Sequence, residues 1–336
     1  MPYVIFDNNQ ATNRLVYEGP GGFLLRIAYR FARWRLLPLV FLPVLFFWPF
    51  FSVNAADSFP IEMKDDRGVT VRLSAPARRV VSLAPSLTEM IFLLGKESVL
   101  VGVTKFCNYP PAASSLPKIG GMTDPNVERI ITLSPDLVLC TTDGNSRERV
   151  LTLERMGIPC FAVAPQNIKA VFASIERIGT LIGSADRART EAAELERRVE
   201  AVRLSICKRG EAAPRVLFVV STSPIIVAGS ATFMDELLGL AGARNAAGAF
   251  RSMYPRFSVE ELVVSAPDII FIAAMKGVER FSPDLTKWKD IPAFRDGAVF
   301  NIDGDLVTRP GPRLVTALEK ISAILAEIYD RRVESE

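Results

Sequence analysis

Two stretches of this 336-residue sequence share one pattern: VERIITLSPDLVL at residues 127–139 and VEELVVSAPDIIF at residues 259–271, an offset of 132 residues. In each stretch a short helical period leads through a Pro-Asp pair into an apolar run. This is the pattern of a helix followed by a buried strand. The two copies predict two lobes built on one α/β design.

Two more matches occur in the same order. RVVSL at residues 79–83 resembles RVLFV at 215–219, and LTEMIFLLG at 87–95 resembles FMDELLGLAG at 233–242. Around them, apolar runs alternate with helical periods, which predicts parallel sheets covered by helices. We therefore expect an α/β protein of two Rossmann-like lobes. Before the first copy, two short alternating runs around residues 65–68 predict a hairpin.

The segment between the copies predicts a rigid connection. Apolar residues recur three and four apart through residues 185–208, so this segment forms one helix of about 36 Å. A preceding helix is expected over 168–182. The predicted organisation is an N-terminal lobe at 57–167, a helical region with this spine helix at 168–208, and a C-terminal lobe at 209–336. A ligand cleft is expected between the lobes.

The N-terminus has the features of an export signal. An apolar run at residues 36–51 follows four arginines between residues 26 and 35 and precedes the small residues of VNAAD at 53–57. This pattern predicts a signal peptide over residues 1–56, cleaved after Ala55 or Ala56, and a periplasmic protein. A membrane anchor is disfavoured because three prolines interrupt a run shorter than the roughly 20 residues a span needs. The long flank leaves open a start downstream of Met1. No cysteine lies near the cleavage region, so a lipoprotein is not evident.

Composition excludes several classes of function. Removing residues 1–56 takes five basic and two acidic residues from totals of 40 and 37 and leaves 35 of each sign, so no footprint for nucleic acid is expected. There is no histidine and no CxxC spacing among Cys107, Cys140, Cys160 and Cys207, which argues against zinc sites and imidazole bases. Neither first strand is followed by GxGxxG. We expect no enzyme, no resident metal and no cofactor. The cysteines are expected to be buried hydrophobes, with a disulfide left open.

An ordered set of motifs resembles a known family. ARRVVSLAPSLTE at 77–89 is followed by VGVT at 101–104, NYPP at 108–111, LPKIGG at 116–121 and NVERIITLSPDLVL at 126–139. This order is similar to that of the helical-backbone, class III periplasmic substrate-binding proteins of cobalamin and iron-siderophore ABC transporters, most of all the vitamin B12-binding proteins. The resemblance covers residue 59 to the C-terminus. It implies a monomer that binds a metal chelate between its lobes and delivers it to a permease dimer powered by an ATPase.

The expected ligand contacts follow the strands of both lobes, because ligands of open parallel sheets lie beyond the carboxyl ends of the strands. A corrin or siderophore has a broad, partly apolar face that suits aromatic and methionine side chains with a few polar groups. The candidate contacts are Ser86, Phe106, Tyr109, Met122, Thr142, Ser223, Met253, Tyr254, Met275 and Arg309.

The choice of chelate stays open between cobalamin, which is preferred, and a ferric siderophore. Phe106 stands where the B12-binding relatives have an aromatic residue, but Met122 and Thr142 stand in loops where those relatives carry tryptophans. The cations expected for an anionic chelate are Lys105, Arg251, Arg256, Lys276 and, first among them, Arg309. Haem is disfavoured, since without histidine only tyrosine, methionine or cysteine could be its axial ligand. A ligand sensor on the same fold is the alternative to transport.

Glu128 and Glu260 occupy matching places in the repeat, each two residues after an expected N-cap, Asn126 or Ser258. A carboxylate in the first turn of a helix is stabilised by the helix dipole, which alone accounts for both. Glu261 completes a capping box with Ser258. The family resemblance implies a second role for Glu128 and Glu260, one on each lobe, as partners for arginines of the two permease subunits.

Overall fold

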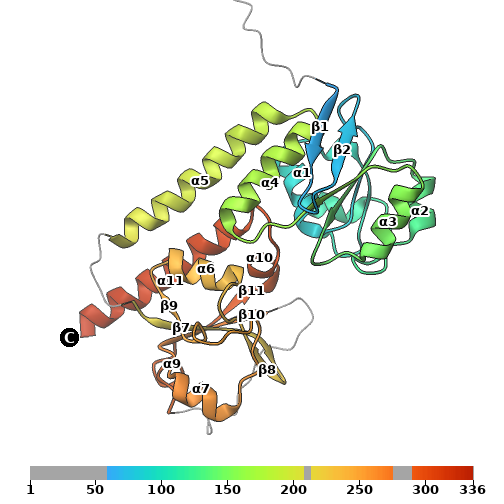
Figure 1. The fold of residues 1–336 in the computed structure, drawn as a ribbon. Helices are drawn as coiled ribbons and strands as arrows, with labels where there is room; N and C mark the ends of the chain where they lie inside the picture. Colours follow the sequence, from blue (N-terminus) through green and yellow to red (C-terminus); the bar gives the residue numbers. More distant parts are fainter. Residues whose placement is uncertain (1–58, 208–212, 275–289, 336) are drawn as a thin grey trace, which may run out of the picture. The chain divides into compact units, whose positions relative to one another are not determined.

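The computed structural model describes residues 59–207, 213–274 and 290–335 (Figure 1). The predicted signal peptide lies outside these residues. None of the helices in the described part of the chain is both long and apolar enough to cross a membrane. Both lobes belong to one unit of the structure, residues 53–336.

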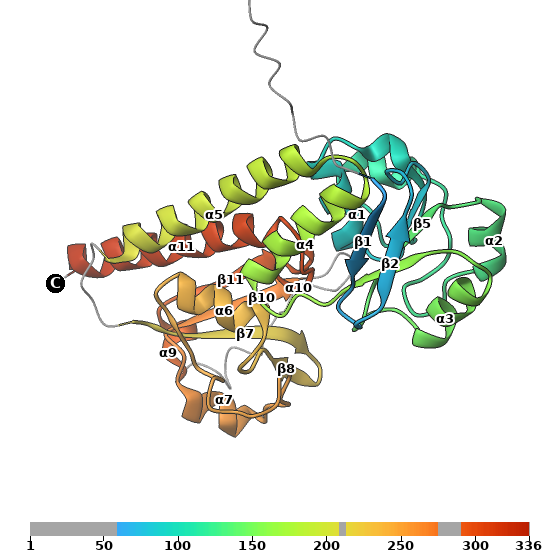
Figure 2. The same cartoon turned by 45° about the horizontal axis from the view of Figure 1, so that its top comes forward.

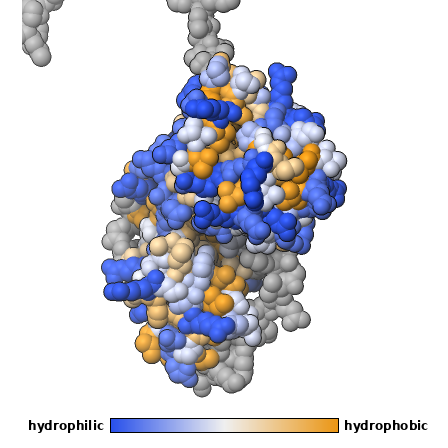
Figure 3. Space-filling model, turned by 45° about the vertical axis from the view of Figure 1, so that its right-hand side comes forward, coloured by the Kyte–Doolittle hydropathy of each residue, from blue (hydrophilic) through white to orange (hydrophobic). Residues whose placement is uncertain are grey.

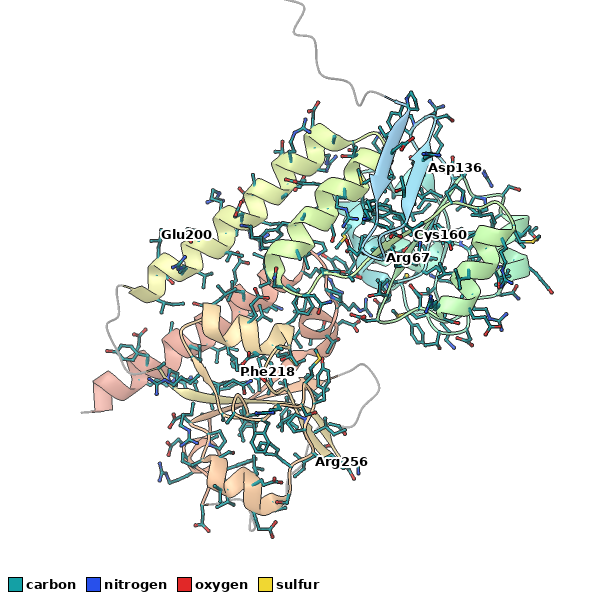
Figure 4. The ribbon with its side chains drawn as sticks, viewed as in Figure 1. Arg67, Asp136, Cys160, Glu200, Phe218 and Arg256 are labelled. Carbon is teal, nitrogen blue, oxygen red and sulfur yellow. The ribbon has the colours of Figure 1, made fainter. Side chains whose placement is uncertain are left out.

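The predicted hairpin is confirmed and is attached to the N-terminal lobe through its turn. Strands β1 (Ile61–Lys64) and β2 (Thr70–Leu73) pair antiparallel. The buried Asp65 carboxylate accepts a hydrogen bond from the backbone N of Ala162 at 3.2 Å and forms an ion pair with Arg67. Arg67 also pairs with Glu154 at 2.8 Å and donates to the carbonyl oxygen of Cys160 at 3.0 Å (Figure 4). The turn is therefore tied to two elements of the lobe.

The N-terminal lobe contains a four-stranded parallel sheet in the order β4-β3-β5-β6. Its strands are β3 (Val80–Ser82), β4 (Leu100–Val103), β5 (Leu137–Thr141) and β6 (Cys160–Val163). Its helices are α1 (Pro85–Leu93), α2 (Val127–Thr132) and α3 (Arg147–Arg155), with 3-10 turns η1 (Glu97–Val99) and η2 (Pro111–Ser115). Every residue of β3 and β6 is buried, as expected for parallel strands covered on both faces. The predicted alternation of strands and helices is confirmed here.

The C-terminal lobe repeats this order and adds to it. Strands β9 (Arg244–Asn245), β7 (Arg215–Thr222), β10 (Ile269–Ala274) and β11 (Val299–Asp303) pair in parallel in that sequence, which matches β4-β3-β5-β6. The addition is β8 (Ile225–Val227), which pairs antiparallel with β7 and was not predicted. The helices are α6 (Phe233–Leu240), α7 (Val259–Ser265), α9 (Pro292–Arg295) and α10 (Gly304–Thr308). Phe218 of β7 lies in the core against Phe271, with ring centroids 5.2 Å apart (Figure 4).

A short helix that the sequence did not predict follows β11. Residues 304–308, just before the candidate contact Arg309, form α10. The side chain of Asp303 caps this helix by accepting a hydrogen bond from the backbone N of Asp305 at 2.9 Å. Because the helix is short, its apolar period is too brief to stand out in the sequence.

The aspartate of the repeated Pro-Asp pair accepts equivalent backbone hydrogen bonds in both lobes. Asp136 accepts hydrogen bonds from the backbone N atoms of Arg78 and Arg79 at 2.8 and 3.0 Å (Figure 4). Asp268 accepts one from the backbone N of Arg215 at 2.8 Å. The residues before the two prolines, Ser134 and Ala266, both adopt the left-handed conformation, with φ of 46° and 39°. Each carboxylate thus joins the start of a repeat strand to the start of the lobe's first strand.

The predicted connection is confirmed as α4 (Ile168–Leu181) followed by α5 (Ala185–Cys207). The two helices approach closely where a Cβ on Gly179 would lie 2.2 Å from the Cβ of Ala188. The final helix, α11 (Leu314–Ser335), lies beside α5 (Figure 2) and was not predicted. Arg198 of α5 forms a bidentate ion pair with Glu319 of α11, with distances of 2.8 and 2.6 Å. The spine is therefore a group of helices rather than a single one.

The cysteines behave as buried hydrophobes. Cys107, Cys140 and Cys160 are free and buried, and the side chain of Cys207 lies outside the described residues. Burial raises the pKa of the Cys140 thiol to about 12 and also raises the pKa of the Cys160 thiol. Both thiols are protonated at neutral pH and so are poor nucleophiles.

Glu236 provides a test of the contact between α6 and the start of α4. Its carboxylate accepts a hydrogen bond from the backbone N of Ile168 at 2.9 Å. Burial raises the pKa of Glu236 and the hydrogen bond opposes that rise. The raised pKa means that the contribution of Glu236 to stability is present below its ordinary pKa of 4.5 and is lost as pH rises through the folded-state value.

Glu236→Gln keeps an oxygen acceptor for Ile168 but does not titrate. We therefore expect its free energy of unfolding, compared with that of wild type, to be higher at pH 7 than at pH 4.5. Urea unfolding at both pH values measures the difference in the free energy of unfolding. Glu176→Gln, at an exposed position of α4, is the control. A difference between wild type and Glu236→Gln that is the same at both pH values would contradict the assignment.

Candidate functional site

The loop after β4 exposes two aromatic residues of the predicted site. Phe106 is 47% exposed and Tyr109 is 46% exposed. The Nζ of Lys105 lies 5.2 Å from the centroid of the Phe106 ring. The loop begins at a fixed backbone position, because the backbone N of Lys105 donates to the carbonyl oxygen of Gly120 at 2.9 Å. Two rings are therefore presented to solvent from an anchored loop.

The C-terminal lobe exposes a corresponding pair in the loop before α7. Met253 is 48% exposed and Tyr254 is 47% exposed. Their loop is held by its backbone: the carbonyl oxygen of Met253 accepts from Gly229 N at 2.8 Å and that of Pro255 accepts from Val227 N at 3.1 Å. A Cβ on Gly229 would lie 2.2 Å from the carbonyl oxygen of Ser252, so this close approach requires glycine. The phenol of Tyr254 is a hydrogen-bond donor at neutral pH, as for any tyrosine, and partial burial raises its pKa further above the ordinary value.

These residues stand out from the rest of the surface. Among the described residues, the only aromatic side chains classed as exposed are Phe106, Tyr109 and Tyr254, and all three belong to the predicted site. On the face shown in Figure 3, hydrophobic residues lie in small groups among hydrophilic ones. Aromatic side chains are enriched where proteins bind partners and ligands, so exposed rings on both lobes indicate a candidate binding surface.

The other predicted contacts differ in accessibility. Thr142 and Ser223 are exposed, and the Thr142 hydroxyl donates to Asp143 at 2.9 Å. Met122 is half-buried, and its methyl group would lie 2.6 Å from a Cβ on Gly144. Ser86 is only 4% exposed and sits against Gly311, where an added Cβ would lie 3.3 Å from its own. Met275 and Lys276 lie outside the described residues.

Arg309 is not a free cation. Its side chain is 14% exposed and forms ion pairs with Glu89 at 3.2 Å and Asp305 at 2.7 Å. It also donates to the side-chain oxygen of Asn108 at 2.8 Å. The positive charge expected to meet an anionic ligand is therefore already compensated within the protein.

Three other cations are available at the surface. Lys105, Arg251 and Arg256 are exposed, and none forms an ion pair within the part of the chain that the structure describes. Arg256 lies at the edge of the C-terminal lobe beside β8 (Figure 4). The two arginines, Arg251 and Arg256, flank Met253 and Tyr254 in the sequence, so any anionic group bound there would meet positive charge.

Asn145 organises the N-terminal side of the site and was not predicted as a site residue. Its side-chain nitrogen donates to the carbonyl oxygens of Leu83 at 2.8 Å and Met122 at 2.9 Å. Its side-chain oxygen accepts from the backbone N of Thr141 at 2.8 Å. One amide thus fixes three strand-end loops. The only signal in the sequence is an asparagine in a strand-end loop, and that signal is common.

Glu128 and Glu260 hold the same position in their lobes. Both are exposed, and each is the second residue of its helix, α2 or α7. The expected caps are confirmed: Asn126 accepts from the backbone N of Arg129 at 2.8 Å, and Ser258 and Glu261 form the capping box. Neither Glu128 nor Glu260 forms an ion pair with a described residue. Both carboxylates are therefore open to an outside partner.

The fold and these surfaces define a two-lobe α/β receptor with a helical connection. Residues 80–306 match the model of the periplasmic binding protein family, and the chain belongs to that family. The vitamin B12-binding protein of Vibrio vulnificus (strain CMCP6) is 28% identical over 261 residues, which are 77% of this chain and 94% of that protein. The uncharacterized ABC transporter substrate-binding lipoprotein YvrC of Bacillus subtilis is 32% identical over 276 residues, 79% of this chain and 85% of that protein.

Solved structures agree with this assignment. The periplasmic vitamin B12-binding protein BtuF of Vibrio cholerae matches with a TM-score of 0.67 at 25% identity, covering 75% of this chain and 97% of that one. The apo form of the periplasmic haem-binding protein RhuT from Roseiflexus sp. RS-1 matches with a TM-score of 0.65 at 27% identity, covering 74% and 97%. The fold is thus shared by proteins named for different chelates.

Asn145 gives a stability prediction for the N-terminal side of the site. Asn145→Ala removes three hydrogen bonds to backbone groups, so we expect the free energy of unfolding to fall by about 2 kcal/mol. Denaturant unfolding measures the change, with Thr142→Ala, at an exposed position in the same loop, as the control. Equal stability of the two variants would show that Asn145 does not hold the loops together.

Proposed function

We propose that this chain is the substrate-binding component of an ABC importer and that it captures cobalamin or a related corrinoid in the periplasm. The observation that carries the proposal is the exposure of Phe106 and Tyr109 on one lobe and of Met253 and Tyr254 on the other. Flat rings and a methionine suit the broad, partly apolar face of a corrin. The similarity to vitamin B12-binding proteins supports the same ligand.

Polar groups in the strand-end loops suit the amide edge of such a ligand. Thr142 and Ser223 are exposed beyond the ends of β5 and β7, and the Tyr254 phenol is a donor at neutral pH. Hydrogen bonds from a few such groups would set the orientation of a ligand held mainly by its face. Met275 belongs to the proposed contacts but lies outside the described residues.

A ferric siderophore is the second candidate. Lys105, Arg251 and Arg256 are exposed cations on both lobes, and they favour a chelate that carries negative charge. Haem is a weaker candidate despite the similarity to RhuT, because with no histidine in the chain the axial ligand would have to be a tyrosine, methionine or cysteine.

Titration separates these candidates. Protein beginning at residue 57 is titrated with cobalamin, a ferric siderophore and haem, following heat and the absorbance of each ligand. We expect cobalamin to bind in a one-to-one complex and Phe106→Ala or Tyr254→Ala to weaken binding about tenfold each, through loss of ring contact. Met156→Ala, at another exposed apolar position, is the control and should bind like wild type. No binding of any of the three would overturn the proposal.

Delivery requires a surface that fits a permease. Glu128 and Glu260 place one open carboxylate on each lobe at equivalent positions of the repeat. A pair of charges related by an approximate twofold suits two permease subunits related by a twofold, and would set encounter and register more than affinity. This pair of carboxylates favours transport over sensing, because it suits a permease dimer. The proposed partners are thus a permease dimer with its ATPase, and the proposed receptor is a monomer.

The docking role predicts a separation of transport from binding. Glu128→Arg combined with Glu260→Arg should abolish uptake of labelled cobalamin by cells while the purified variant keeps wild-type affinity. The control combines Glu176→Arg with Glu196→Arg, at exposed positions of α4 and α5, which makes the same change of charge away from α2 and α7. Normal uptake by the docking variant, or uptake lost equally in the control, would rule out docking through these glutamates.

A further inference from the structure

Glu89 is a buried carboxylate that the proposed function does not use. It belongs to α1, its side chain is 1% exposed, and it is bound by two arginines from the other end of the chain. Arg313 donates to its two oxygens at 2.9 and 2.6 Å, and Arg309 lies 3.2 Å from one of them. The Glu89 network consists of Glu89, Asn108, Asp305, Arg309 and Arg313.

We propose that Glu89 is a positioning residue for the ligand site. Its network holds the loop of residues 106–109 against the segment that joins α10 to α11, and so fixes the two aromatic rings that the loop presents. The inference rests on the proposed function only in taking these rings to contact the ligand.

The charges of the network balance within it. Arg309 and Arg313 carry two positive charges, and Glu89 and Asp305 carry two negative charges. The side chains of both arginines are only 14% exposed. Charges this poorly solvated persist only when they are paired, and removal of one partner leaves the other buried without compensation. The network therefore strongly favours a single arrangement.

The 106–109 loop is bound to the network at three points. The side chain of Asn108 accepts from Arg309 at 2.8 Å and donates to Asp305 at 3.2 Å. Arg309 also reaches the carbonyl oxygen of Phe106 at 3.5 Å. The guanidinium carbon of Arg313 lies 4.2 Å from the centroid of the Tyr109 ring, a cation–π contact. The arginines thus contact the Phe106 backbone, the Asn108 side-chain amide and the Tyr109 ring. Movement of the loop would break these charged contacts.

The network also joins the two halves of the repeat. Glu89 and the 106–109 loop belong to the N-terminal lobe, and the two arginines follow β11 of the C-terminal lobe. Gly311 sits close to Ser86, so the segment lies directly on α1. The orientation of the rings is thereby set by the contact between lobes, and a ligand that binds does not have to order the loop.

An ion pair away from the loop serves as a control. Arg198 and Glu319 form a bidentate pair between α5 and α11, at 2.8 and 2.6 Å, and the Glu319 side chain is 39% exposed against 1% for Glu89. Glu319→Gln removes this pair without touching the 106–109 loop. Because a solvated pair contributes less to stability than a buried one, the free energy of unfolding of every variant is measured beside its exchange. Asn108→Ala is the second variant, because it removes the two side-chain hydrogen bonds of the loop to the network and leaves the ion pairs of Glu89 in place.

The experiment measures the loop and the ligand separately. Hydrogen–deuterium exchange of the ligand-free protein should be at least several times faster at residues 106–109 in Glu89→Gln and in Asn108→Ala, and unchanged there in Glu319→Gln. Cobalamin titration should show about tenfold weaker binding in the first two variants. The reason is that the ligand must then order the loop, and this cost reduces the affinity. The Glu319→Gln protein should bind like wild type.

Each outcome has one meaning. Unchanged exchange of the loop in Asn108→Ala overturns the inference, and so does equal acceleration in Glu319→Gln. Faster exchange with unchanged affinity for cobalamin also overturns it. Failure of wild type to bind cobalamin, a siderophore or haem would instead overturn the proposed function, and the exchange measurement would still show whether Glu89 holds the loop. If Glu89→Gln does not fold, Asn108→Ala decides the question alone.

Discussion

The structure depends first on the junction between the helix and the strand in each copy of the repeat. Asp136 and Asp268 each accept hydrogen bonds from the backbone at the start of the lobe's first strand. A carboxylate held by amide donors from a neighbouring strand sets where the two strands begin relative to each other. Directly after this contact the strands pair in equivalent register in the two lobes, Val80 with Leu137 and Val216 with Ile269. In each sheet the strand-end loops then emerge from one edge, at the carboxyl ends of the parallel strands.

The features that the sequence predicts are those carried by local patterns. Each copy of the repeat, the hairpin and the helix α5 appears as a period or a turn signal within a few tens of residues. What it does not predict depends on distant partners. Strand β8 pairs antiparallel with the end of β7, and α11 lies on α5 through Arg198 and Glu319, which are 121 residues apart. No pattern within either segment reports such a partner.

The same division applies to the candidate site. The exposed rings of Phe106, Tyr109 and Tyr254 could be placed from the sequence, because the carboxyl ends of parallel strands share one edge of the sheet. The state of Arg309 could not. In the sequence it is a cation in a strand-end segment, whereas in the structure its charge is compensated by Glu89, 220 residues away in the chain. Accessible charge is a property of the folded protein, and among the expected cations in the described residues Lys105, Arg251 and Arg256 are the exposed ones.

The two lobes present their rings by different physical means. The 106–109 loop has a backbone hydrogen bond from Cys107 to Thr104 and, in addition, charged side-chain contacts, which hold only while every buried partner is present. The Met253–Tyr254 pair is held by backbone hydrogen bonds to Gly229 and Val227, and its methionine keeps several rotatable bonds. Under the proposed function, the held rings of the 106–109 loop would contact one face of the ligand, and the Met253 side chain could adjust to the other face by changing rotamer.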